Sequence, residues 1–161
     1  MNRSLICLSL VAACAAANAQ NERDSTRKMA EDYFMKADMA INKGDVSGFL
    51  NMFAPSYYSV DTDGKRMEWS TFRSQVMGMM KSTKNVHSTI MIKNVQLMDN
   101  EIVVWTQQQL KYSVNQNGKW MPMVSTTRWA ENLKKVDGKW KFASSQQLMT
   151  NEPWTFKTTG N

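Results

Sequence analysis

Four long segments of strand-like sequence follow one another in the second half of this 161-residue chain. They cover residues 86–98, 101–114, 121–135 and 139–149, and they are rich in Val, Ile, Thr, Trp and Tyr. Three dipeptides that suit tight hairpins separate them: Asp99-Asn100, Asn117-Gly118 and Asp137-Gly138. The pattern predicts an antiparallel meander of four strands, and strands this long must curl into a sheet with a concave face.

The chain before these strands has helical periodicity. Residues 24–42 repeat apolar side chains every three or four positions: Met29, Tyr33, Phe34, Ala37, Ala40 and Ile41. After them, Asp45 can cap a second short helix that Pro55 stops, residues 57–61 read as a short strand, and residues 70–81 form a third helix. Helices placed ahead of a mostly antiparallel sheet define an α+β fold, in which we expect the helices to cover the concave face.

Residues 1–19 have the three parts of a secretory signal peptide. Arg3 gives a positive start, residues 5–17 are apolar or small apart from one serine, and Ala17-Asn18-Ala19 fits a cleavage site. We therefore expect an exported protein, periplasmic or secreted, whose mature chain begins after the cleavage site. A second interpretation stays open, because Val11-Ala12-Ala13-Cys14 is similar to a bacterial lipobox, in which the cysteine would be acylated and retained.

Cleavage would change the chemistry available to the mature chain. Both cysteines, Cys7 and Cys14, would be removed, which excludes disulfides, thiolate metal sites and cysteine nucleophiles. His87 is the only histidine, so a multi-histidine metal site within one chain is excluded, and we expect neither metal nor cofactor. The formal net charge would fall from +6 to +5, because Arg3 is the only charged residue removed. With no recognisable nucleic-acid module and no second long apolar segment, we expect no nucleic-acid partner and no transmembrane segment.

Short motifs along the chain resemble those of a known superfamily. They are Gly44-Asp45-Val46, Phe49-Leu50, Phe53-Ala54-Pro55, residues 57–65, Thr127-Arg128-Trp129, residues 137–142 and Gln146. In this order and spacing they resemble the SnoaL-like branch of the nuclear transport factor 2-like superfamily. The resemblance implies a curved sheet wrapped around helices into a cone with an internal pocket, often paired as a homodimer through the sheet. We expect one such domain over residues 20–152 and a loose tail over residues 153–161.

The pocket of such a cone would be lined from the first helix and from alternate strand positions. Aromatic groups with a few polar anchors suit a mostly apolar cavity. The expected ligand-binding residues are Tyr33, Phe34, Trp69, Trp105, Gln107, Trp129 and Gln146. The run Gln107-Gln108-Gln109 puts amides on both faces of one strand, and an amide on a buried face needs hydrogen-bond partners. For each residue taken singly, ordinary core packing is the alternative.

Three residues are candidates for acid–base chemistry. Asp61 follows the first strand at a position similar to the general-base aspartate of ketosteroid isomerases in this superfamily, where an apolar cavity raises the pKa of a carboxyl group. Tyr33 is a candidate hydrogen-bond donor to an oxyanion, and His87 is a proton shuttle if it faces the cavity. The alternatives are a polar turn over residues 61–64 and a histidine that is structural or exposed.

These observations leave three functional hypotheses. The first is an exported, homodimeric domain that binds a small, largely apolar molecule without catalysis. The second is a cofactor-independent isomerase, dehydratase or cyclase that uses an acid–base residue in the pocket. The third, an assembly module working through its sheet surface, requires a large exposed apolar patch. Whether the protein is an enzyme stays open, because members of one fold family include both enzymes and binding domains.

Overall fold

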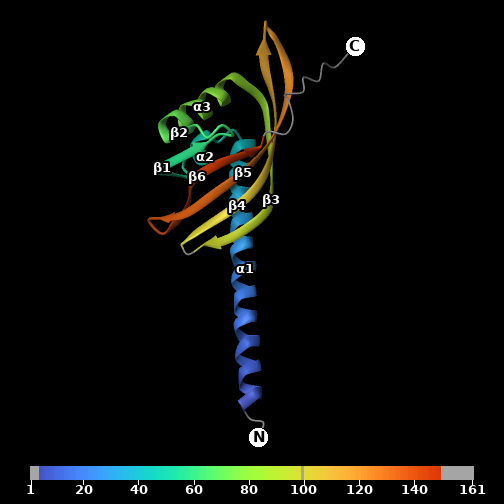
Figure 1. The fold of residues 1–161 in the computed structure, drawn as a ribbon. Helices are drawn as coiled ribbons and strands as arrows, with labels where there is room; N and C mark the ends of the chain where they lie inside the picture. Colours follow the sequence, from blue (N-terminus) through green and yellow to red (C-terminus); the bar gives the residue numbers. More distant parts are fainter. Residues whose placement is uncertain (1–3, 99, 150–161) are drawn as a thin grey trace.

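The computed structural model describes residues 4–98 and 100–149, with side chains over 20–98 and 100–148. One layer of the fold is a six-stranded sheet in the order β2-β1-β6-β5-β4-β3. The strands are β1 (Phe53–Val60), β2 (Arg66–Glu68), β3 (Thr83–Met98), β4 (Glu101–Gln116), β5 (Lys119–Val136) and β6 (Lys139–Met149). Neighbouring strands are antiparallel except for β1 and β6, which are parallel. The sheet is curved and does not close into a barrel (Figure 1).

Three helices form the second layer: α1 (Ser4–Asn42), α2 (Val46–Leu50) and α3 (Trp69–Ser82). The C-terminal half of α1 crosses the sheet, and its N-terminal half extends beyond the sheet (Figure 1). No helix among the described residues has the length and apolar character needed to cross a membrane. The predicted α+β architecture, with helices against a strongly curved and mostly antiparallel sheet, is confirmed.

The hairpins follow the turn chemistry read from the sequence. Asn117 and Gly118 both have positive φ, of 53° and 82°, and Asp137 and Gly138 have φ of 51° and 74°. Two consecutive residues with positive φ are typical of the two-residue turns whose twist matches that of the flanking strands. In the β3–β4 hairpin, Met98 pairs with Glu101, while Asp99 lies outside the described residues. The predicted meander of four long strands is confirmed.

The N-terminal elements differ from the expected boundaries in two places. Helix α1 is continuous from Ser4, whereas the sequence pattern placed its start at residue 24. Helix α2 is capped by Asp45, whose Oδ1 accepts from the Gly48 N–H at 2.8 Å, but it ends at Leu50. Pro55 therefore lies inside β1 rather than stopping a helix. The strand tolerates it because the β1–β6 register is irregular between Phe53 and Tyr58, so no regular ladder hydrogen bond is lost there.

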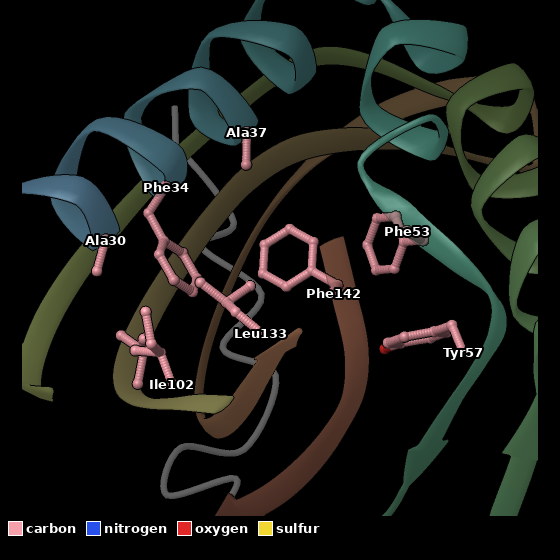
Figure 2. Close-up of a cluster of buried hydrophobic side chains, with 9 residues drawn as sticks. Ala30, Phe34, Ala37, Phe53, Tyr57, Ile102, Leu133 and Phe142 are labelled. Atoms are coloured by element: carbon pink, nitrogen blue, oxygen red, sulfur yellow. The ribbon is translucent and has the colours of Figure 1, made fainter. Parts of the chain in front are cut away.

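The hydrophobic core lies between α1 and the concave face of the sheet. In Figure 2, Ala30, Phe34 and Ala37 of α1 face Ile102 of β4 and Leu133 of β5. On the other side of the central Phe142 ring lie Phe53 and Tyr57 of β1, and the Phe53 and Phe142 ring centroids are 4.8 Å apart. Spacings of four and three residues put the α1 side chains on one helical face, as the periodicity predicts. The predicted tail over residues 153–161 lies outside the described residues.

Polar side chains also hold α1 to the edge strand β3. Asp38 accepts through Oδ1 from the Ser88 hydroxyl at 2.6 Å and through Oδ2 from the Ile90 N–H at 2.7 Å. One turn later, Asn42 accepts from the Ser88 N–H at 2.6 Å and donates to the Ser88 carbonyl at 3.0 Å. These bonds give an edge strand part of the pairing that a neighbouring strand would otherwise supply, and they fix the position of α1 along the sheet.

Truncation of Leu133 should show how strongly the core depends on contacts between the helix and the sheet. Leu133 is 0% exposed, whereas Leu97 of β3 is 39% exposed. Leu133→Ala should lower the free energy of unfolding by about 2–5 kcal/mol, because it removes buried methyl groups and leaves a cavity. Leu97→Ala should change it by less than about 0.5 kcal/mol. Urea unfolding of both variants makes the comparison, and equal losses would contradict this description of the core.

Candidate functional site

An internal cavity of about 90 Å³ lies between α1, α3 and the concave face of the sheet. Its lining residues are Phe34, Ala37, Phe49, Phe53, Tyr57, Phe72, Ile90, Gln108, Trp129, Glu131, Phe142 and Ser145. Most of this wall is aromatic, and the rings meet edge-on or tilted, as in the Phe53–Tyr57 pair with centroids 4.7 Å apart. The cavity therefore offers an apolar environment with a few polar groups, the usual composition of a small-molecule site.

One wall of the cavity carries a connected chain of polar groups. The Tyr57 hydroxyl donates to Ser145 Oγ at 2.8 Å, and the Ser145 hydroxyl donates to Glu131 Oε2. Strand register brings the last two together, because Val104 pairs with Glu131 and Glu131 pairs with Ser145 across β4, β5 and β6. Residues directly opposite on paired strands share a face of the sheet. Val104 is buried, so Glu131 and Ser145 face inward with it.

The surroundings of this chain disfavour charge. Burial raises the pKa of Glu131 from 4.5 to about 7, although the hydrogen bond from Ser145 acts in the opposite direction. Burial also raises the pKa of Tyr57 above its ordinary value, and the neighbouring Glu131 carboxyl raises it further. A carboxyl group with a pKa near neutrality can accept or release a proton at physiological pH, which makes Glu131 the strongest candidate for acid–base chemistry in the cavity.

A second polar group reaches the cavity from β4. Gln108 Nε2 donates to Ser88 Oγ at 3.0 Å, and the Ser88 hydroxyl in turn donates to Asp38. Because an ionised carboxylate is only an acceptor, the Ser88 proton must point to Asp38, and the Gln108 group facing Ser88 must be its NH₂. The amide orientation of Gln108 is thus set by the same network that holds α1 to β3.

The structure brings two of the predicted ligand-binding residues to this cavity. Phe34 of α1 and Trp129 of β5 both line it. The Trp129 indole N–H donates to Thr127 Oγ1 at 2.8 Å, so its ring is fixed by a neighbour two residues away on the same strand. Aromatic surface of this kind suits an apolar ligand.

Three other predicted ligand-binding residues lie on the outer face of the sheet. Along β4, Ile102, Val104 and Thr106 are buried and alternate with Trp105 and Gln107. Trp105 pairs with Ala130, and Ala130 pairs with Gln146, so the Gln146 side chain lies on the same face as that of Trp105. The side chains of Trp105, Gln107 and Gln146 therefore project away from the cavity. In a strand, a shift of one residue exchanges the two faces. The inward-facing amide of the glutamine run is therefore Gln108.

Tyr33 and Trp69 lie beside the cavity rather than in its lining. The Tyr33 hydroxyl donates to the Met52 carbonyl at 2.7 Å, which commits it to the backbone and leaves no proton for an oxyanion. Burial raises the pKa of this hydroxyl as well. The Trp69 ring stacks on Phe53 with centroids 5.5 Å apart, and Phe53 separates it from the cavity. Trp69 instead faces a groove between α2 and α3.

The other two acid–base candidates also lie outside the cavity lining. Asp61 Oδ1 accepts from the N–H groups of Asp63 at 3.0 Å and Lys65 at 2.8 Å, which is the polar turn that the sequence offered as an alternative. His87 is exposed on β3, where it pairs with Lys111 of β4. The carboxyl group that lines the cavity is therefore that of Glu131, not that of Asp61. The structure does not bring Asp61, His87 and Tyr33 together in one site.

Tyr57, Gln108, Glu131 and Ser145 were absent from the predicted site. A signal for Glu131 exists in the sequence, because it interrupts an alternate row of β5 that also contains Trp129 and Leu133. A carboxyl group in an apolar row of a strand is unusual and needs a reason. Among the described residues, no cluster of three or more histidine, cysteine, aspartate or glutamate side chains is arranged to hold a metal ion.

Comparisons with solved structures support the fold. The chain is similar to a conserved protein from Planctomyces limnophilus, with 9% identity, a TM-score of 0.66, and coverage of 77% of this chain and 95% of that one. It is also similar to a ketosteroid isomerase-like protein from Erwinia carotovora atroseptica, with 12% identity, a TM-score of 0.57, and coverage of 74% and 93%. An NTF2-like protein from Cytophaga hutchinsonii gives 15% identity, a TM-score of 0.56, and coverage of 75% and 95%.

A comparison with curated proteins finds no match. The sequence does match the family of the SnoaL-like domain over residues 31–150, which is most of the chain. That range runs from the C-terminal half of α1 through β6 and contains all the residues that line the cavity. The chain therefore belongs to the family of the SnoaL-like domain, and its fold is the one seen in the NTF2-like protein from Cytophaga hutchinsonii.

Proposed function

We propose that this protein binds a small, largely apolar molecule in the cavity between α1 and the sheet. The observation that carries the proposal is the meeting of aromatic walls with one polar wall, formed by Tyr57, Ser145 and Glu131. The cavity volume of about 90 Å³ limits the ligand. An engineered cavity of about 150 Å³ takes benzene, which has six heavy atoms, so the ligand that fits in this smaller cavity has about four heavy atoms.

The hydrogen bonds of Glu131 define which polar group the ligand carries. Ser145 donates to Oε2, so the proton of neutral Glu131 belongs on Oε1. Below a pH of about 7 the group is therefore a hydrogen-bond donor, and it suits a ligand with a carbonyl or ether oxygen. Above that pH the carboxylate only accepts, and it loses this partner. A small ketone or a related acceptor is the ligand class that fits the neutral form.

A second candidate function is acid–base catalysis on the same ligand. It is favoured by the pKa of Glu131, which burial raises to about 7 in an apolar cavity. A carboxylate in such surroundings can remove a proton from the carbon next to a carbonyl and return it to another carbon. This is the chemistry of a cofactor-independent isomerase, with Glu131 in the role that the sequence suggested for Asp61.

Export and pairing of two copies complete the proposal. Residues 20–25 are exposed, and among the α1 side chains that the structure describes, from residue 20 onward, Ala30 is the first that is fully buried. Cleavage after Ala19 would therefore leave these buried contacts of the helix with the sheet in place. The outer face of the sheet carries partly exposed apolar groups such as Trp105 and Met91, the latter 42% exposed. A face of this kind is suited to a homodimer formed through the sheet.

Acetone, a four-heavy-atom ketone, tests ligand binding. It should bind at least about tenfold more tightly at pH 5.5 than at pH 8.5, because ionised Glu131 leaves its carbonyl without a donor. Glu131→Gln keeps an NH₂ donor at every pH, so its affinity should be the same at both values. Affinities come from chemical-shift titrations by NMR, with Glu101→Gln as the control, because Glu101 lies at the start of β4 and pairs with Lys134. Absence of binding, or pH dependence unchanged in Glu131→Gln, would contradict the proposal.

The same samples in D₂O separate the binding domain from the enzyme. A catalytic Glu131 carboxylate removes a proton from the carbon next to the acetone carbonyl, leaving an enolate, which then takes a deuteron from the exchanged carboxyl group. Catalysed loss of this proton signal at pH 8, abolished in Glu131→Gln, would favour the enzyme. Binding at pH 5.5 without catalysed exchange at either pH would leave the binding function alone standing.

Ionisation of Glu131 should also appear in the stability of the protein. Its pKa is 4.5 when unperturbed and about 7 in the folded state, so between these values the folded state holds a proton that the unfolded chain has released. The free energy of unfolding should therefore fall as pH rises through this window, by up to about 3 kcal/mol, and level off above it. Urea unfolding at pH 5 and pH 8 measures the change. Glu131→Gln should lose this fall and Glu101→Gln should keep it; an equal fall in both variants would show that Glu131 is not its source.

Native mass spectrometry of protein recovered from the exporting organism tests processing and assembly. The subunit mass should correspond to a chain beginning at Gln20, and the complex should contain two copies. A chain that begins at Cys14 and carries the mass of acyl groups would support the lipoprotein alternative instead. A chain that retains residues 1–19 would contradict export through a cleaved signal peptide.

A further inference from the structure

A groove of about 410 Å³ lies between α2 and α3, on the far side of the aromatic wall from the cavity. Its lining residues are Val46, Ser47, Leu50, Asn51, Trp69, Arg73, Met77, Met80 and Lys81. None of them is a carboxylate. The volume falls within the range of about 300–1,000 Å³ that small-molecule sites occupy, unlike that of the internal cavity.

The α3 side of the groove is a regular stripe of alternating chemistry. Trp69, Arg73, Met77 and Lys81 follow one another at four-residue spacing, which puts them on one face of the helix. No side chain of α3 is buried, and Met77 is 37% exposed. The stripe thus presents apolar surface and positive charge together, in an accessible position.

The two cations of the stripe have no ion-pair partner among the described residues. The nearby acids are engaged elsewhere: Asp45 caps α2 by accepting from the Gly48 N–H at 2.8 Å, and Glu68 pairs with Arg66 at 2.7 Å. Arg73 and Lys81 are both exposed, so their charge is available to a ligand at the rim of the groove. An apolar groove with unneutralised cations selects for an occupant that is apolar along its length and anionic at its end.

We propose that this groove binds a single-chain amphiphile with a carboxylate head, the chemical class of a free fatty acid. Arg73 binds the head, because its guanidinium can make the two parallel hydrogen bonds that match a carboxylate. Lys81 lies two helical turns further along α3, about 12 Å away, and adds positive charge to the same stripe. The chain covers Trp69, Met77 and Met80 of α3 and contacts Leu50 of α2. Methionine side chains adapt to a flexible chain, which suits this kind of ligand.

The position of the groove between two helices favours a single dispersed molecule over a membrane surface. A dispersed fatty acid and the lipids of an anionic membrane both present an anionic head with an apolar chain. A molecule held between two helices is removed from water along its length, whereas a bilayer contacts exposed, protruding groups. The site is separate from the internal cavity, because Trp69 and Phe53 stand between them with ring centroids 5.5 Å apart.

Isothermal titration with decanoate, kept below its micellar concentration in low salt, tests the proposal. Arg73→Gln and Lys81→Gln should each weaken binding about threefold and together about tenfold, as expected for partly exposed charge pairs. Met77→Asp should abolish binding. Lys93→Gln, a change at an exposed cation of β3, and Glu131→Gln, a change inside the cavity, should leave the affinity unchanged. All the groove positions named here are exposed, so the variants should fold, and far-UV circular dichroism checks this.

Four results would overturn the proposal. They are the absence of decanoate binding at millimolar concentration, equal affinity of the Arg73→Gln/Lys81→Gln variant, equal affinity for decyltrimethylammonium, and loss of decanoate binding in Glu131→Gln alone. Vesicles of anionic phospholipid provide the last arm. Binding to these vesicles without binding of dispersed decanoate would assign the stripe to a membrane surface and reject the proposed occupant.

Discussion

The hydrogen bonds between α1 and the edge strand β3 fix the geometry on which the rest of the structure depends. Asp38 and Asn42 bind Ser88 and the Ile90 N–H, and these groups cannot shift along the strand without breaking several bonds at once. The apolar face of α1 alone would tolerate sliding over the concave sheet, because hydrophobic contact has no direction. The polar contacts set the distance between helix and sheet, and so the width of the cavity.

The cavity places a titrating carboxyl where burial opposes its charge. Glu131 is tolerated there because Ser145 and Tyr57 give it hydrogen-bonded neighbours, and because it is neutral below a pH of about 7. A buried polar group without such partners would cost a few kcal/mol. A leucine at this position would pack against the aromatic walls without that cost. A carboxyl group whose charge is opposed by burial in a cavity is a common feature of functional sites.

The two sites of the molecule share an aromatic wall but differ in their electrostatics. Inside, Phe53 and Phe72 face a single acid, while outside, Trp69 continues into a stripe with Arg73. Burial beside the wall raises the pKa of the acid, and Trp69 gives the groove an apolar side. No side chain of α3 is fully buried, so its groove-facing side chains stay accessible. The buried core is formed by α1 and the strands.

The sequence predicted most of the fold but only part of the site, and the reason is physical. Turn dipeptides such as Asn117-Gly118 and Asp137-Gly138 require a special backbone conformation, so they locate strand ends and pairing order in almost any context. They do not determine which face of a strand is buried. That choice depends on where α1 lies, and α1 is positioned by contacts far away in the sequence, such as the one between Asp38 and Ser88. A shift of one residue in strand parity therefore exchanges Gln107 for Gln108 on the inner face of the sheet. In a helix, periodicity alone indicates which face is apolar, and Phe34 lies on that face of α1 and lines the cavity.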